Sequence, residues 1–381
     1  MVDDKVTSLI VIQPTPFCNI DCTYCYLPRR DDRAKLGLED IRRIFERLTT
    51  FPTLPDRVTV VWHAGEPLVL GPAYYDAAFA CIRAVSKSIT FEHAFQTNAM
   101  LIDDRWCDLF QRWNVGLGVS IDGPRHIHDA ARKTRDGRGT FDQAIAGVKC
   151  LQRRNIPFTI ISVLTKAAVL DPDGMFEFYR SLDIRDVGFN IDEQEGIHKA
   201  SSLGDAASET ALTRFFARFG ELMTLHQFPI AVRELEETLA AIRVLDPHGP
   251  MNSQVTPFGI ITIGVDGDVF TFSPELVGYS ATEFPTFAIG NVLRQSFEEL
   301  SASPVLARLT EHVREGVDLC RSQCAYFRLC GGGAPSNKLF ENGTFASTET
   351  LYCRLTKKRV ADFALATIEA NAGRDKPEGT G

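Results

Sequence analysis

Three cysteines near the start of the chain have a spacing that is typical of a metal site. Cys18, Cys22 and Cys25 lie in "CNIDCTYCY" as C-x3-C-x2-C, and the nearest histidine is His63. A structural zinc ion takes four ligands, usually as two separated pairs. Three thiolates on a four-iron cluster leave one iron open, and a reactive metal site needs an open position. The spacing favours such a cluster over a zinc loop completed by a distant ligand, or three unrelated thiols.

A second group of cysteines lies near the end of the chain, in a glycine-rich segment that we expect to be mostly loop. Its members, spaced C-x3-C-x5-C-x22-C, are Cys320, Cys324, Cys330 and Cys353. Four thiolates make a closed site, which suits either a [4Fe–4S] cluster or zinc. Cys81, Cys107 and Cys150 lie on predicted helices among apolar neighbours, where a free cysteine usually packs as a small hydrophobe.

Strand-like and helix-like segments alternate through the first half of the chain and must position these cysteines. The predicted strands are 8–14, 57–63, 88–97, 115–121, 157–165 and 187–191. The predicted helices between them are 38–48, 73–87, 103–113, 140–154 and 173–182. Six strands in this order imply an α/β fold with a parallel sheet, whose ligands lie beyond the carboxyl ends of the strands. The first three cysteines directly follow the first strand, at such an end.

The rhythm changes after about residue 192. Helical patterns cover 207–226 and 231–244, and a closing helix is expected over 355–371. Between them, "ITIGVDGDVFTF" has Asp266-Gly267 flanked by alternating β residues, which predicts a hairpin.

Composition excludes several classes of partner. The chain has 381 residues, 44% hydrophobic, and a formal net charge of −8, which argues against a nucleic-acid partner because phosphate binding needs a basic face. No apolar stretch approaches the roughly 18 residues that span a bilayer, and no signal peptide is evident, so we expect no membrane partner and a cytoplasmic location. Cytosolic thiols stay reduced, which favours metal ligands and core thiols over disulfides for the ten cysteines.

The first cysteine loop resembles that of the radical S-adenosylmethionine (radical SAM) enzymes, with Tyr24 as the aromatic residue in C-x3-C-x-aromatic-C. The resemblance implies a partial (β/α)6 barrel whose first loop holds a [4Fe–4S] cluster. It implies that the amine and carboxylate of SAM chelate the open iron, and that one electron then cleaves SAM to give a 5′-deoxyadenosyl radical. It also implies that Tyr24 lies against the adenine.

Three further strand ends match the same family in the expected order. "HAGEP", with Ala64, Gly65 and Glu66, resembles the GGEP element that binds the SAM amino group, although Ala64 replaces a glycine. Asn98 resembles the polar residue that reaches SAM. Ser120 in "SIDGP", with Arg132 downstream, resembles the pair that binds the carboxylate and ribose. The arginine suits a carboxylate because its planar fork donates two parallel hydrogen bonds.

The second cysteine group resembles a truncated SPASM extension, which in its full form binds two auxiliary clusters. This chain has Ala334 where the family has a further cysteine, and Phe272 and Ser273 at the hairpin tip where the family has another. We therefore expect one auxiliary [4Fe–4S] cluster, on the four cysteines given above. The implied division is a radical SAM core over 1–195, a helical bridge over 196–250, a SPASM-like domain over 251–372 and a disordered tail over 373–381.

From about residue 8 to 370 the chain resembles cyclophane-forming radical SAM/SPASM maturases, in particular the glycine-rich-repeat type (GrrM/OscB type). This implies a ribosomal precursor peptide with a leader and an aromatic-containing, Gly-rich core as substrate, and an electron donor such as flavodoxin or ferredoxin. The implied product is a C–C crosslink between an aromatic ring and the β-carbon of a nearby residue. The alternatives are a thioether-forming maturase, a sulfatase-maturing enzyme of the formylglycine type, or a non-enzymatic zinc or Fe–S interaction protein.

Such a crosslink needs a base for the ring proton. Glu275 in "FSPE" is the first candidate, because it follows the hairpin next to the second cysteine group. Asp122 is the second candidate, although an aspartate there can also hold its own turn together. His63, His126 and His128 have no second ligand set, and we interpret them as structural.

Overall fold

One sheet runs through the computed structural model, which describes residues 5–244 and 250–374. Its strands are β1 (Leu9–Ile12), β2 (Arg57–Trp62), β3 (Thr90–Thr97), β4 (Gly116–Ser120), β5 (Thr159–Leu164), β6 (Asp186–Ile191), β7 (Ala231–Val232), β8 (Ile260–Ile263), β9 (Asp268–Thr271) and β10 (Gly290–Asn291). Within the described residues the order is β10-β9-β8-β1-β2-β3-β4-β5-β6-β7. Neighbours from β8 to β7 are parallel, whereas β9 and β10 pair antiparallel.

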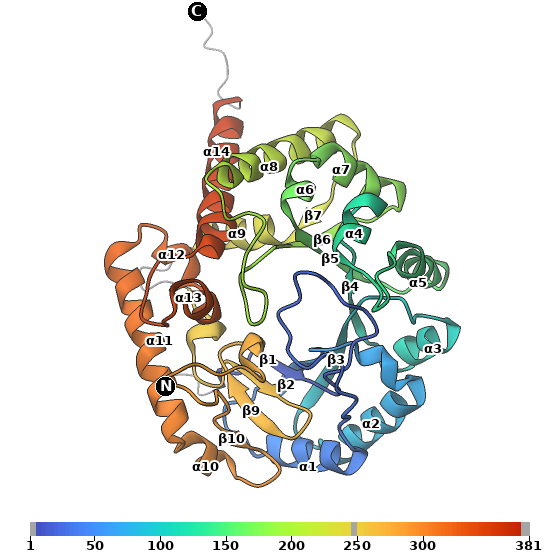
Figure 1. Ribbon diagram of the computed structural model, residues 1–381, viewed down its shortest axis with the longest axis vertical. Helices are drawn as coiled ribbons and strands as arrows, with labels where there is room; N and C mark the ends of the chain where they lie inside the picture. The colour runs from blue at the N-terminus through green and yellow to red at the C-terminus, as the bar shows by residue number, and fades with distance from the viewer. Residues whose placement is uncertain (1–4, 245–249, 375–381) are drawn as a thin grey trace, which may run out of the picture.

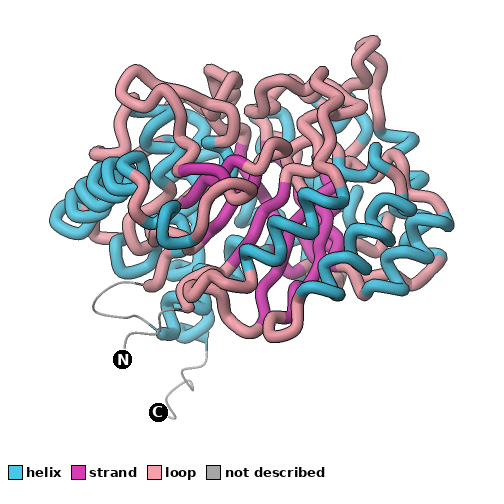
Figure 2. The backbone as a smooth tube through the Cα atoms, turned by 90° about the horizontal axis from the view of Figure 1, so that it is seen from below, coloured by secondary structure: helices cyan, strands magenta, loops and turns pink. Residues whose placement is uncertain are grey.

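Helices cover the outside of this sheet, as Figures 1 and 2 show. They are α1 (Leu38–Leu48), α2 (Pro72–Val85), α3 (Asp104–Trp113), α4 (Arg125–Ala131), α5 (Phe141–Arg153), α6 (Lys166–Val169), α7 (Pro172–Ser181), α8 (Ala207–Leu225), α9 (Arg233–Val244), α10 (Phe297–Ser301), α11 (Pro304–Gln323), α12 (Phe327–Cys330), α13 (Pro335–Asn342) and α14 (Arg359–Arg374). In α1 the apolar residues expected at helical spacing are Leu38, Ile41, Ile44, Phe45 and Leu48; the last four are fully buried, whereas Leu38 at the start of the helix is exposed. Burial of each such side chain contributes about 1.5–3 kcal/mol.

The six strands expected in the first half of the chain are confirmed as β1 to β6, with shifts of one or two residues at most ends. The α/β fold class with a mostly parallel sheet is confirmed as well. Because β1 to β6 are parallel neighbours, the loops after them meet at one edge of the sheet. The cysteine loop, the "HAGEP" turn and the segments after β3 and β4 are therefore neighbours in space.

The predicted hairpin forms as β8 and β9, but it joins the barrel sheet. β8 lies parallel to β1, with Leu9 opposite Ile260. All four side chains of β8 are buried, which is typical of a strand inside a parallel sheet. Local pattern reveals the hairpin, whereas its docking on a strand some 250 residues earlier depends on tertiary packing that periodicity does not encode.

The expectation of a mostly loop-like segment around the second cysteine group is wrong. The long helix α11 ends just after Cys320, α12 ends at Cys330, and Cys353 begins a π-helical segment, Cys353–Lys358, that continues into α14. Glycines in "CGGG" suggested loop, but they occupy only the turn between α12 and α13. The division into domains stays a prediction, and residues 375–381 of the predicted tail lie outside the described residues.

Candidate active site

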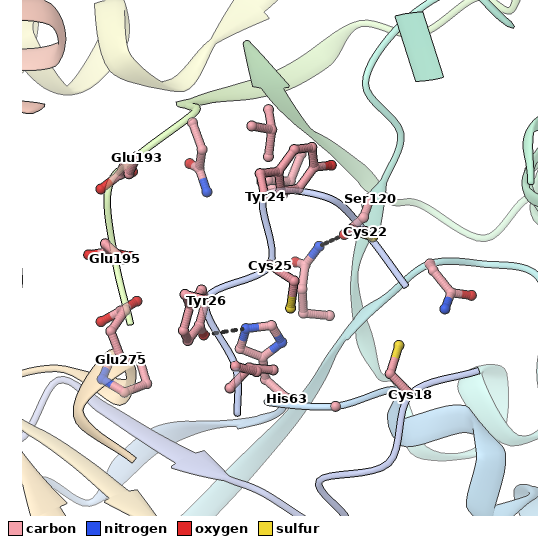
Figure 3. Close-up of a pocket in the computed structure, with 18 of the residues that line it drawn as sticks. Cys18, Cys22, Tyr24, Cys25, Tyr26, His63, Ser120, Glu193, Glu195 and Glu275 are labelled. Atoms are coloured by element: carbon pink, nitrogen blue, oxygen red, sulfur yellow. Dashed lines mark hydrogen bonds between the residues drawn. The ribbon is translucent and has the colours of Figure 1, made fainter. Parts of the chain in front are cut away.

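The first three cysteines come from one loop, between β1 and α1, and their side chains line one cavity of about 530 Å³ (Figure 3). Backbone bonds fix this loop: the Cys18 amide donates to the Arg30 carbonyl at 3.1 Å, and the Thr23 amide donates to the Ala131 carbonyl at 3.0 Å. Burial raises the pKa of the Cys22 thiol to about 12, and the nearby Arg132 guanidinium opposes that shift. Because a bound metal deprotonates its thiol ligands, it would reverse this preference for the neutral form.

The "HAGEP" turn after β2 packs directly against the cysteine loop. A Cβ at Gly65, where φ is +132°, would lie 2.3 Å from the Thr15 carbonyl oxygen, so only glycine fits. Ala64 takes φ 66°, a left-handed conformation that disfavours a side chain, and is fully buried. Its carbonyl accepts a hydrogen bond from Gln13 Nε2 at 2.9 Å. Gly65 therefore presents bare backbone to the cavity that it lines.

The Glu66 carboxylate ties the end of β2 to the end of β3. It accepts hydrogen bonds from Thr97 Oγ1 at 2.7 Å and from the amides of Asn98 and Leu68 at 2.8 and 3.0 Å. Burial raises its pKa to about 7, and these donors oppose the shift. Glu66 thus holds the turn in place, and the Asn98 side chain in turn donates from Nδ2 to Asn19 Oδ1 in the cysteine loop at 2.7 Å.

Tyr24, Asp122 and Arg132 form one buried group. The Tyr24 hydroxyl donates to Asp122 Oδ2 at 2.5 Å, while Arg132 Nη2 and the Val163 amide donate to Asp122 Oδ1, each at 3.0 Å. Asp122 is fully buried and is not among the cavity-lining residues. Its two oxygens are therefore occupied, and the geometry favours a positioning role for Asp122 in place of the base considered from the sequence.

One hydrogen-bond donor of the Arg132 guanidinium is unpaired. Its Nε is buried and has no hydrogen-bond partner in the structure, although the residue lines the cavity. Buried polar groups normally find a partner, so an anionic ligand is expected there. Ser120 also lines the cavity, and its hydroxyl accepts a hydrogen bond from Gln96 Nε2 at 2.7 Å. Three thiols, a bare glycine backbone and an unpaired guanidinium nitrogen form a donor set that fits a cluster together with SAM.

Three glutamates line the opposite side of the cavity, as Figure 3 shows. They are Glu193 and Glu195, which follow β6, and Glu275, which follows β9. Asn337 Nδ2 donates to Glu193 Oε2 at 2.6 Å and to Glu195 Oε1 at 3.3 Å, and the Ser273 hydroxyl donates to Glu275 Oε2. Burial raises the pKa of all three carboxyls, of Glu193 to about 8, and Glu275 further raises those of Glu193 and Glu195.

Tyr26, which belongs to the cysteine loop, and His63 lie beside one another in the same cavity, as Figure 3 shows. The Tyr26 hydroxyl is 3.4 Å from His63 Nε2, and His63 Nδ1 is buried without a partner. Burial lowers the pKa of His63 to about 4, so the ring is neutral at physiological pH. His63 was interpreted from the sequence as structural, and it lines the cavity as well. Glu193 and Glu195 were not among the residues singled out, although they directly follow a predicted strand end, where the ligands of a parallel sheet gather.

The four C-terminal cysteines are brought together from separate helical segments. Burial raises the pKa of the Cys353 thiol to about 12, and Cys330 and Cys324 add to the shift. Burial also raises the pKa of the Cys330 thiol; the backbone of Gly332 and Gly333 opposes the shift, and Cys324 and Cys320 add to it. These mutual interactions place the four thiols near one another, and four thiols form a donor set that fits an iron–sulfur cluster.

The described residues contain no group of three or more His, Cys, Asp or Glu side chains arranged to hold a single metal ion. Thiols that bind a cluster reach different irons and so lie farther apart than the ligands of one ion. Among the other thiols, Cys107 and Cys150 are buried in the core, with their sulfurs 3.6 Å apart, and Cys81 is partly buried.

Comparison with known families decides the assignment. The model of the radical SAM superfamily matches residues 12–171, which contain the cysteine loop and the strand ends that surround it. Residues 12–171 therefore carry a radical SAM domain. Members of that superfamily use SAM and a [4Fe–4S] cluster, and this chain is a radical SAM enzyme.

Related proteins extend over nearly the whole chain. An uncharacterized protein of Synechocystis sp. is 40% identical over 374 residues, which cover 96% of this chain and 93% of that protein. A serine-type anaerobic sulfatase-maturating enzyme of Bacteroides thetaiotaomicron is 22% identical over 356 residues, which cover 86% of this chain and 83% of that enzyme.

Solved structures share the fold of this radical SAM enzyme. The structure of anSMEcpe with bound AdoMet and the Cp18Cys peptide has a TM-score of 0.79 at 20% identity, covering 97% of this chain and 100% of that chain. Streptococcus suis SuiB bound to the precursor peptide SuiA has a TM-score of 0.64 at 15% identity, covering 92% and 76%. At these identities the likeness concerns the fold alone. Among the described residues no helix is both long enough and apolar enough to cross a membrane.

Proposed function

We propose that this enzyme modifies a ribosomal precursor peptide and forms a C–C (cyclophane) crosslink between an aromatic side chain and the β-carbon of a nearby residue. The observation that carries the proposal is the single cavity that extends from the three thiols to the three glutamates. A peptide segment lying in it would have a radical source on one side and proton acceptors on the other. Two solved structures of the same fold were determined with peptides bound, which supports a peptide as substrate.

Residues around the cysteine loop would bind the cluster and SAM. Cys18, Cys22 and Cys25 would hold the cluster, and the Gly65 backbone, Asn98, Ser120 and Arg132 would hold SAM, with Tyr24 beside it. When bound, SAM and the reduced cluster supply an adenosyl radical for hydrogen abstraction. Arg132 would use its free Nε to bind the SAM carboxylate, while Asp122 fixes the rest of the guanidinium. Ala64 and Glu66 would shape the turn and leave direct contact to Gly65.

The three cavity-lining glutamates, Glu193, Glu195 and Glu275, form what we call the glutamate wall, which would accept the ring proton that crosslinking releases. Glu275 lines the cavity and one of its oxygens accepts from Ser273, which orients the carboxylate. A general base works best when its pKa lies near the operating pH, and burial moves the pKa of this carboxyl upward from its ordinary value. Glu193 and Glu195 would share the proton, because neighbouring buried carboxylates cannot all ionise at once.

The C-terminal cysteines would hold one auxiliary [4Fe–4S] cluster, which accepts the electron released when the ring regains aromaticity. Tyr352 lines the cavity and directly precedes Cys353, so the two sites are adjacent along the chain. A flavodoxin or ferredoxin would supply electrons to the N-terminal cluster, and we propose a cytoplasmic location, where thiols stay reduced. The proposed domains keep the boundaries given above, with β8 of the SPASM-like domain sharing the barrel sheet.

A second candidate is the maturation of sulfatases, in which a serine or cysteine is oxidised to formylglycine. The full-length similarity to a sulfatase-maturating enzyme favours it. The missing cysteines argue for the crosslinking proposal, because Phe272, Ser273 and Ala334 replace ligands expected for a second auxiliary cluster.

Mass spectrometry separates the two candidates. The enzyme is co-expressed with a small Gly-rich open reading frame from its genomic neighbourhood, or with a sulfatase peptide. Crosslinking predicts loss of two hydrogens per link, missing fragment ions between the joined residues, and no reaction with hydrazide reagents. A hydrazide-reactive aldehyde on the sulfatase peptide, with an unchanged precursor, would overturn the proposal in favour of the second candidate.

A further inference from the structure

A buried lysine lies against one of the C-terminal cysteines. Lys338 in α13 is only 3% exposed, and its Nζ donates to the Gly316 carbonyl at 2.8 Å and to Cys320 Sγ at 3.3 Å. The close approach requires Gly316, since a Cβ there would lie 3.1 Å from Lys338 Nζ and 2.1 Å from the Phe345 carbonyl oxygen. Gly316 therefore leaves space on the surface of α11 in which the Lys338 ammonium reaches the sulfur.

No carboxylate balances the charge. Within the described residues Lys338 forms no ion pair, and its two hydrogen-bond acceptors are a neutral carbonyl and the sulfur of Cys320. A buried ammonium is costly unless an anion is nearby. The sulfur can supply that anion as a thiolate, whereas a neutral thiol accepts the hydrogen bond and donates its own to the Gly332 carbonyl at 3.8 Å without balancing the charge. A metal-bound thiolate at Cys320 therefore balances the charge that a neutral thiol leaves uncompensated.

The N-terminal cysteines lack such a contact. Within the described residues no side chain donates a hydrogen bond to the sulfur of Cys18, Cys22 or Cys25, and Arg132, whose charge acts on Cys22, donates to Asp122 instead. Among the candidate cluster ligands in the described residues, Cys320 is therefore the one whose sulfur accepts a hydrogen bond from a cationic side chain.

We propose that Lys338 tunes the reduction potential of an iron–sulfur cluster held by the C-terminal cysteines; this rests on the auxiliary cluster assigned under the proposed function. Hydrogen bonds to the sulfurs, net charge and solvent exposure set the potential of such clusters. An ammonium bonded to a ligand sulfur stabilises the reduced cluster, which is one charge more negative. It thereby keeps the cluster able to accept an electron from the substrate side of the reaction.

The test is a redox titration of the full-length chain followed by electron paramagnetic resonance. The parent carries Cys18→Ala, Cys22→Ala and Cys25→Ala, so that only the C-terminal cluster contributes a signal. In this parent, Lys338→Met is expected to shift the one-electron reduction equilibrium at least tenfold toward the oxidised cluster, about 59 mV more negative. Lys338→Arg keeps the charge and is expected to shift it less than half as far. Lys149→Met, an exposed lysine on α5, is the control and is expected to leave it unchanged.

A Lys338→Met protein that titrates at the parent potential overturns the inference, and so does a parent that contains zinc in place of iron at this site. If Lys338→Met does not fold or does not retain the cluster, Lys338→Gln decides, because it keeps a hydrogen-bond donor and removes the charge. Its potential is expected between those of the Met variant and the parent, and an unchanged value overturns the inference. The titration needs no peptide, so failure to crosslink a precursor would leave its result intact.

Discussion

The two cysteine groups of this enzyme have opposite surroundings. The N-terminal group takes three thiols from one loop and opens onto a large cavity, where Arg132 keeps an unpaired nitrogen. The C-terminal group takes four thiols from separate helical segments, and its Cys320 sulfur accepts a hydrogen bond from the buried Lys338. The difference shows how the surroundings of similar ligands can leave one centre open to a substrate and close another around its own donors.

The largest effect is expected from removing one thiol of the N-terminal cysteine group, which we call the open site; the C-terminal group is the closed site. Cys22→Ala takes away one of only three cluster ligands, so formation of 5′-deoxyadenosine should fall to background, about 10³-fold or more, because no radical source remains. The loss is measured by chromatography after anaerobic reconstitution and dithionite reduction. About eight irons per chain are expected in the parent if both sites hold four-iron clusters. Cys22→Ala should contain about half as many.

Cys81→Ala serves as the matched control, since this thiol is only partly buried and lies on α2, away from both groups. It should retain full iron and full SAM cleavage. Iron equal to the parent in Cys22→Ala, with activity intact, would contradict the assignment of the open site.

The glutamate wall belongs only to the open site, and its removal tests whether that cavity also holds the base. Glu275→Gln should slow crosslinking by about 10²-fold or more, while leaving 5′-deoxyadenosine formation nearly unchanged. In the parent the base must be ionised, and burial raises the pKa of the Glu275 carboxyl above its ordinary value. Crosslinking should therefore weaken as the pH falls, and the loss should begin at a higher pH than the ordinary pKa of a glutamate would give.

The pH profile is measured by mass spectrometry of the peptide at saturating SAM. In Glu275→Gln the remaining activity should lose most of this pH dependence. A Gln variant with the parent rate and the parent profile would remove Glu275 from the mechanism.

Replacing Arg132 tests whether its positive charge binds SAM in the open site. Arg132→Met removes a charge-assisted hydrogen bond to the SAM carboxylate, so SAM should bind about tenfold to hundredfold more weakly, as measured by equilibrium binding. The same change leaves the buried Asp122 carboxylate without its cation and should cost about 3 kcal/mol of unfolding free energy. The double variant Asp122→Asn/Arg132→Met should recover part of that stability but none of the SAM affinity. Recovery of both would assign Arg132 a purely structural role.

Sequence patterns predicted the parts of this molecule that depend on local chemistry. The strand ends that carry Cys18, Gly65, Asn98 and Ser120 could be located because period, cysteine spacing and turn residues are local features. The parallel docking of β8 on β1 could not, since it depends on which buried strand edges remain free after the barrel forms. Glu193 and Glu195 were missed for a similar reason: an acidic run after a strand resembles a solvated loop, and the contact with Asn337, which comes from a distant helix, is not a local feature.

The smallest effects are expected from substituting one turn residue near each cysteine group. Ala64→Gly relieves a left-handed alanine and should stabilise the protein by about 1 kcal/mol, measured by denaturant unfolding, without weakening SAM binding. Gly332→Ala places a side chain at φ +107°, with its Cβ 2.9 Å from Val317 Cγ2, and should destabilise by about 2 kcal/mol. Equal and small effects at both positions would mean that neither turn is held tightly around its site.

The central claim is that the cluster of the open site generates the radical, whereas the cluster of the closed site only accepts the electron that the substrate releases when its ring regains aromaticity. Cys353→Ala, assayed for 5′-deoxyadenosine and for crosslinked peptide in the same reaction, tests it most directly. SAM cleavage should remain within a few-fold of the parent, while crosslinked product should be lost, because the electron released from the substrate has no acceptor. Loss of both activities together, or retention of both, would contradict the account.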